Sequence, residues 1–183
     1  VHLDTSVTSI PDGAFRNNYH LRNVTGGNIT SMGNYSFYYA ERLSSINLEG
    51  VQLIGERCFE RLGRHVSQLG LSMSPIASST VTSIGANAFY YSEIESVEFP
   101  NLQTVNGGIF QDCFILENVS LPAVTSIGMR GFANCRLNGT VLFGNVTNLG
   151  PLSFQGSGLI SIDMPNVQTI ENSAFENCVN LVN

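Results

Sequence analysis

Phenylalanines recur along the chain at a nearly constant spacing, and apolar positions recur with them. One aliphatic column lies five residues before each phenylalanine and another lies eight residues before, and neither contains a polar residue. Successive aligned phenylalanines are 22, 22, 30, 21, 22, 22 and 21 residues apart. They are Phe15, Phe37, Phe59, Phe89, Phe110, Phe132, Phe154 and Phe175. A fixed period of this length is typical of a chain built from stacked structural repeats.

A second apolar phrase of the form L-x-x-V-x-L follows most of these phenylalanines. In the fifth unit it reads Leu116, Val119 and Leu121. The alternation over its last positions predicts a strand with one buried face. Proline follows directly in three units, where it would end the strand because it cannot donate to a ladder. A positive φ or a close backbone approach would explain a glycine column four residues before the phenylalanine. That column contains Gly33, Gly55, Gly85, Gly128 and Gly150.

The period predicts a solenoid, because a unit of 21 to 22 residues cannot bury its apolar face alone. We expect a single domain over residues 1–183 and an α/β solenoid that is mostly β. About eight coils should stack with a parallel β-sheet on one face and short strands, turns or helical turns on the other. The third unit carries extra residues, which we expect to loop out within residues 70–81. No polar capping repeat is visible, so we expect a fragment of a longer protein.

The repeat unit resembles that of the BspA-like leucine-rich repeat family. The segment LENVSLPAVTSIGMRGFANC, residues 116–135, matches the family pattern well. Similar segments are IESVEFPNLQTVNGGIFQDC at 94–113 and LISIDMPNVQTIENSAFENC at 159–178. The resemblance covers the whole chain. It implies a leucine-rich-repeat solenoid in an extracellular or cell-surface protein that acts in adhesion or protein binding, with no shared catalytic residues.

Charge and composition exclude several function classes. The net charge is −6 with only eight basic residues, so no basic cluster is available for nucleic acid or anionic membranes. No run of 18 apolar residues is present, so we expect no membrane insertion by this segment. The three histidines and four cysteines show neither HExxH nor CxxC spacing. We therefore expect no metal, no cofactor, no catalytic residues and no enzyme activity.

The cysteines share one column of the repeat with alanine and serine. Cys113, Cys135 and Cys178 each stand three residues after an aligned phenylalanine. This position predicts small buried side chains with free thiols. A disulfide between Cys113 and Cys135 is the alternative, because these residues should lie on neighbouring coils.

Candidate binding residues lie on the outward face of the predicted sheet. The residues that flank the central apolar position of each strand should point to solvent. The candidate ligand-facing residues are Asn47, Ser96, Glu98, Asn118, Ser120, Thr140, Ser161 and Asp163. We expect partners among host or neighbouring-cell proteins, extracellular matrix included, with glycans as a further class. Two alternatives stay open, namely a structural spacer in a larger surface protein and a carbohydrate-recognition module that uses exposed tyrosines and acidic side chains.

Overall fold

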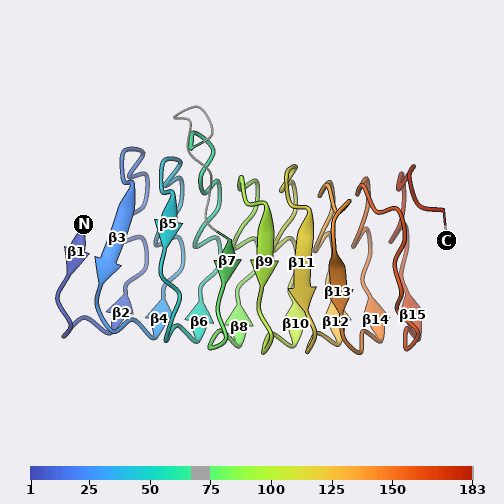
Figure 1. Ribbon diagram of the computed structural model, residues 1–183, viewed down its shortest axis with the longest axis horizontal. Helices are drawn as coiled ribbons and strands as arrows, with labels where there is room; N and C mark the ends of the chain where they lie inside the picture. The colour runs from blue at the N-terminus through green and yellow to red at the C-terminus, as the bar shows by residue number, and fades with distance from the viewer. Residues whose placement is uncertain (67–74, 183) are drawn as a thin grey trace.

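A computed structural model describes residues 1–66 and 75–182 as a parallel β-solenoid (Figure 1). The coils follow one another along the long axis of the molecule, from the N-terminus at one end to the C-terminus at the other. Each strand pairs with the strand of the neighbouring coil, and every pairing is parallel. The leucine-rich-repeat type of solenoid expected from the sequence is therefore confirmed.

Two rows of short strands run along the solenoid. We call the first row the front sheet: β1 (His2–Leu3), β3 (Asn23–Gly26), β5 (Ser45–Ile46), β7 (Ile76–Ala77), β9 (Ser96–Glu98), β11 (Asn118–Leu121) and β13 (Val141–Phe143). The second row is the back sheet: β2 (Ser9–Ile10), β4 (Ser31–Met32), β6 (Leu53–Ile54), β8 (Ser83–Ile84), β10 (Thr104–Val105), β12 (Ser126–Ile127), β14 (Asn148–Leu149) and β15 (Thr169–Ile170). The back strands mark seven full turns, close to the expected eight coils.

Both sheets are interrupted once. The front sheet divides into the ladders β1-β3-β5 and β7-β9-β11-β13, and the back sheet divides between β8 and β10. At the second break Asn106 stands in the glycine column, and its side-chain amide donates to the Ile84 carbonyl at 2.7 Å. In other coils the backbone N–H of a glycine, such as Gly55, donates to the equivalent carbonyl.

The longer third coil coincides with the break in the front sheet. Ile76 pairs with Val97, and the Ser78 hydroxyl donates to the Leu48 carbonyl at 3.0 Å. Residues 76–81 therefore belong to the regular coil, although the sequence placed the extra residues within 70–81. Those residues must precede Ile76, and 67–74 themselves lie outside the described residues.

The third side of each coil is a series of tight turns. The residues two before and two after each aligned phenylalanine have positive φ, as in Tyr35 (56°) and Tyr39 (62°) around Phe37. The N–H groups of these three residues donate to carbonyls of the next coil at 2.9 Å each. The sequence predicted short strands, turns or helical turns away from the front sheet, and the described residues form short strands and turns without a helix. Left-handed residues four apart explain this, because they interrupt any run of right-handed helical residues.

The glycine column is explained by close approach and not by positive φ. A Cβ atom on Gly55 would lie 2.5 Å from the carbonyl carbon of Gly33 and 2.6 Å from the amide nitrogen of Asn34. Neither Gly33 nor Gly55 has positive φ. Neighbouring coils therefore touch through their backbones at this column, which leaves no room for a side chain.

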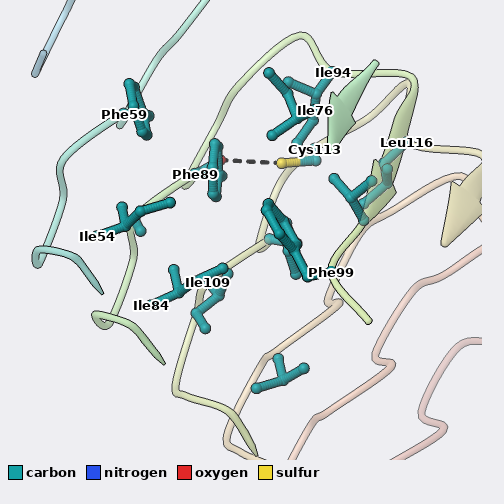
Figure 2. Packing of buried hydrophobic residues seen from close by; sticks show 14 of the residues in the cluster. Ile54, Phe59, Ile76, Ile84, Phe89, Ile94, Phe99, Ile109, Cys113 and Leu116 are labelled. Carbon is teal, nitrogen blue, oxygen red and sulfur yellow. Dashed lines mark hydrogen bonds between the residues drawn. The ribbon is translucent and has the colours of Figure 1, made fainter. Parts of the chain in front are cut away.

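The aligned phenylalanines form one continuous stack through the core. Adjacent ring centroids are 5.1 to 5.7 Å apart, and their planes differ by 18° or less. Figure 2 shows part of the stack, with Phe59 and Phe89 among buried isoleucines. Offset stacking of this kind is favourable beyond the apolar area that it buries.

The cysteine column has a hydrogen-bonding role beside the stack. All four thiols are free, as the sequence predicted. The Cys113 thiol donates to the Phe89 carbonyl at 3.1 Å (Figure 2), and Cys135 donates to Phe110 at 2.9 Å. Burial raises the pKa of Cys58 and of Cys113 to about 12. These thiols are therefore protonated at neutral pH, and that of Cys113 serves as a buried donor.

Candidate functional site

The front sheet brings five of the eight candidate residues together. Ser96 and Glu98 lie on β9, and the register places them beside Asn118 and Ser120 of β11. Thr140 comes directly before β13. These five residues line a shallow depression of about 160 Å³, which we call the front depression. The depression is present because Ser96 and Ser120 have small side chains, whereas the larger residues of these strands point into the core.

The polar side chains of the front depression differ in whether they already have a hydrogen-bond or ion-pair partner. The Asn118 Oδ1 atom accepts a hydrogen bond from the Thr140 N–H at 2.9 Å, which orients the amide and keeps its Nδ2 atom as a donor. The Glu98 side chain is exposed, and its carboxylate makes no hydrogen bond or ion pair with another described residue. Glu117, in contrast, is paired with Arg136 at 2.8 Å. The depression therefore offers one oriented amide and one uncompensated carboxylate.

Three candidate residues lie outside the front depression. Asn47 follows β5, which belongs to the other front ladder, and its Oδ1 atom accepts from the Glu49 N–H at 2.9 Å. Ser161 and Asp163 are exposed but fall in 161–164, where the described chain forms no strand. The sequence predicted a strand there from the alternation of Ile162 and Met164. The ladder ends at β13 instead, so the expected face is shorter than the column of residues that predicted it.

The structure adds residues that the sequence did not propose. Pro75 and Ala77 close one end of the front depression. Sequence reasoning missed them because the extra residues of the third unit shift its alignment with the other repeats. The repeat distance between Ile76 and Val97 could have identified β7. Leu142, which is 54% exposed, pairs in register with Ser120 and adds an apolar rim.

Arginines and tyrosines cover the turn side of the first four coils. The Arg61 guanidinium lies 4.4 Å from the Tyr39 ring centroid and 5.5 Å from that of Tyr91. Its Nε atom is 3.2 Å from the Glu41 carboxylate. Both tyrosines are only partly exposed, so these contacts brace neighbouring coils. Burial, together with a hydrogen bond to Tyr39, raises the pKa of Tyr38 to about 12.

Metal binding finds no support in the geometry. Among residues 1–66 and 75–182, no three histidine, cysteine, aspartate or glutamate side chains are grouped closely enough to hold an ion. Within the same residues no helix is long and apolar enough to cross a membrane.

Comparison of the sequence with protein families decides the identity of the repeat. The family model described as BspA type Leucine rich repeat region matches residues 1–70 and 82–183 in six copies. The chain belongs to the BspA-type leucine-rich repeat family. This family is generally a non-catalytic repeat scaffold.

Two crystal structures share the solenoid fold of this BspA-type chain. One is a leucine-rich repeat protein from Bacteroides ovatus ATCC 8483, with a TM-score of 0.65 and 21% identity, over 98% of this chain and 53% of that one. The other is a leucine rich cell surface protein from Faecalibacterium prausnitzii A2-165, with a TM-score of 0.51 and 21% identity. It is covered over 37% of its length, and this chain over 100%. A comparison with curated proteins gave no match.

Proposed function

We propose that this chain is a non-catalytic protein-binding module of a cell-surface or secreted protein, and that the front depression takes part in adhesion. The observation that carries the proposal is the exposed carboxylate of Glu98, which lines the same depression as the oriented amide of Asn118. Both lie on rigid strands that the stacked core holds in place. A site on rigid strands needs little ordering on binding, which lowers the entropic cost of association.

The charge distribution favours a partner with a basic segment. Residues 67–183 contain eight carboxylates and two arginines, whereas residues 1–66 contain six of each. The whole net charge of −6 therefore belongs to the part of the chain that includes the front depression. Such a potential speeds the encounter with a positively charged partner and disfavours acidic ones. The surface location is supported by the name of the Faecalibacterium neighbour, a cell surface protein.

The first test is a binding screen of this chain against immobilised extracellular-matrix and plasma proteins. We expect a saturable interaction that weakens at higher salt, because exposed charge pairs are screened. Glu98→Gln should lower the affinity. Glu171→Gln is the matched control, since it removes the same charge from an exposed residue next to the back sheet.

The remaining outcomes separate the alternatives. Equal loss of affinity in both variants would show that net charge alone acts and would remove the front depression from consideration. Asp163→Asn tests whether the binding surface extends past β13. No saturable binding to any protein would contradict the module and favour a structural spacer, a role that suits the elongated shape in Figure 1.

A further inference from the structure

The solenoid has a rim whose height differs from coil to coil. We define the rim segment as the residues between the position three after the aligned phenylalanine and the next leucine or isoleucine that is buried in the core or packed against it. It has two residues in the coil of Phe110, Phe114 and Ile115, and two in the coil of Phe175, Val179 and Asn180. The two coils between them have one residue each, Arg136 and Gly158.

The short rim segments create a notch two coils wide. Leu116, Leu137 and Leu159 are all buried, so the shorter coils keep the same anchor and must cross the rim by a shorter path. Phe114 and Asn180 stand on the full-length coils on either side and line the same hollow, whose volume is about 350 Å³. We call this hollow the rim notch. Its volume lies near the lower end of the range, about 300 to 1,000 Å³, that is usual for ligand sites.

The walls of the rim notch combine one aromatic ring with neutral amides. Phe114 is 53% exposed, and its ring is held edge-on against Tyr91 at a centroid distance of 5.4 Å. Asn134 donates to Asp112 through Nδ2 at 2.7 Å, so its Oδ1 atom stays available. Asn138 and Asn180 make no side-chain hydrogen bond with another described residue. The notch is therefore polar, preformed and open.

We infer that the rim notch binds a neutral saccharide, with one sugar ring packed on Phe114 and its hydroxyls paired with the asparagine amides. A sugar hydroxyl both donates and accepts a hydrogen bond, and an asparagine amide likewise offers a donor and an acceptor without charge. The apolar C–H face of a pyranose ring matches an exposed aromatic wall. Arg136 adds guanidinium donors beside its ion pair with Glu117, and these donors reach hydroxyl oxygens equally well.

Charged peptides fit the rim notch less well. No carboxylate lines it, so a basic peptide would find no counter-charge. Its one cation, Arg136, is already paired with Glu117 at 2.8 Å, so an acidic peptide would have to compete for that contact. The rim notch and the front depression share no residue, so sugar binding can be tested without reference to the proposed protein partner.

The experiment is a titration of ¹⁵N-labelled protein with glucose, galactose, mannose and N-acetylglucosamine, followed by NMR. Each sugar is raised to about 50 mM, because a single ring is expected to bind weakly. We expect at least one sugar to shift the side-chain amide signals of Asn138 and Asn180 and the backbone signal of Gly158 in a saturable way.

Variants place the binding. Phe114→Ala should weaken the sugar about fivefold or more, since it removes the aromatic wall. Tyr19→Ala is the matched control. Tyr19 stands four residues after Phe15, the position that Phe114 holds in the coil of Phe110, and it is 48% exposed. The coil after Tyr19 has a full two-residue rim segment, so its rim segment is not shortened as it is beside Phe114. Asn138→Leu keeps the side-chain volume and removes the amide, so it tests the polar wall separately if the first variant alters the fold.

Three results would overturn the inference. The first is the absence of saturable shifts with all four sugars. The second is binding that Phe114→Ala and Asn138→Leu leave unchanged. The third is a stronger saturation of the same signals by oligoglutamate or oligolysine peptides than by any sugar, which would assign the rim notch to a charged protein segment.

Discussion

Removing one ring from the middle of the phenylalanine stack should cost far more stability than removing one from its end. Phe110 is fully buried, and its ring is stacked between Phe89 at 5.7 Å and Phe132 at 5.2 Å. Phe110→Ala should therefore cost about 3 to 5 kcal/mol, the usual range for a core phenylalanine. Phe175 is only partly buried and stacks on one ring, Phe154, at 5.4 Å. Phe175→Ala should cost about half as much or less.

Urea unfolding followed by far-ultraviolet circular dichroism measures this difference. With a denaturant slope of about 2 kcal/mol per molar, Phe110→Ala should lower the midpoint by about 2 M and Phe175→Ala by about 1 M or less. The central variant should also broaden the transition, because each coil contacts only its neighbours and a gap uncouples the two halves. Equal midpoint shifts for the two variants would refute the view that the continuous stack holds the coils together.

Three further predictions concern single columns and one buried charge. The Cys113 thiol, with a pKa raised to about 12 by burial, should resist iodoacetamide in the native chain and react fully in urea; native labelling seen by mass spectrometry would contradict this. Burial also raises the pKa of Glu60, so the folded state binds the Glu60 proton more readily than the unfolded state does. Ionisation of Glu60 therefore destabilises the fold, and this loss of stability is reversed as pH falls through the folded-state pKa. Glu60→Gln should therefore leave the urea midpoint at neutral pH unchanged or higher, and a lower midpoint would argue that the ion pair dominates. Gly55→Ala should destabilise the chain by about 1 to 3 kcal/mol, whereas Gly107→Ala, whose added Cβ would meet nothing nearer than 3.5 Å, should be neutral in the same unfolding assay.

The sequence predicted the inward half of this fold well. Away from the two ends of the solenoid, the columns that contain Phe110, Val105 and Leu102 are buried, as their unbroken apolar character indicated, whereas Phe175 is partly buried and Ile170 is 60% exposed in the last coil. Such columns can be recognised in the sequence because a buried position accepts few residue types and every coil needs an apolar residue at the same position. The free thiols were readable for the same reason, since Cys113 shares its column with small side chains.

The turns carry only a partial compositional signal, because some of their positive-φ positions hold asparagine or glycine and others hold arginine or tyrosine. Arg57 and Arg61 adopt positive φ at 50° and 62°, although such a conformation costs a non-glycine residue about 1 to 2 kcal/mol. Hydrogen bonds to the next coil offset this cost, as between the Arg61 N–H and the Tyr90 carbonyl at 2.9 Å. That compensation exists only in the assembled stack, so no local pattern reveals it. The sequence therefore left short strands, turns and helical turns open on this side, and the assembled stack selects turns.

The sequence predicted which residues of the candidate site face solvent, but not how far the site extends along the solenoid. Alternation identified which side of β9 and β11 faces solvent, and so placed Glu98 and Asn118 correctly. It could not show where the ladder ends, because Ile162 and Met164 alternate like the strands before them yet form no strand. Strand formation depends on pairing with the neighbouring coil, and the alternation within one repeat unit does not show whether that pairing occurs.

Differences in segment length are therefore more informative about binding surfaces in this solenoid than residue type alone. Packing fixes the inward columns, so two neighbouring coils differ in the lengths of the segments between their buried anchors and in the side chains that point outward. A coil that loses one rim residue, as at Arg136 and Gly158, must leave space beside a full-length neighbour such as the coil of Phe114. The coil of Phe89, whose rim segment also has one residue, shows the same effect, with a smaller hollow of about 80 Å³ between Arg64 and Phe114. Hollows thus follow from counting residues between anchors, and the side chains that line them decide the ligand.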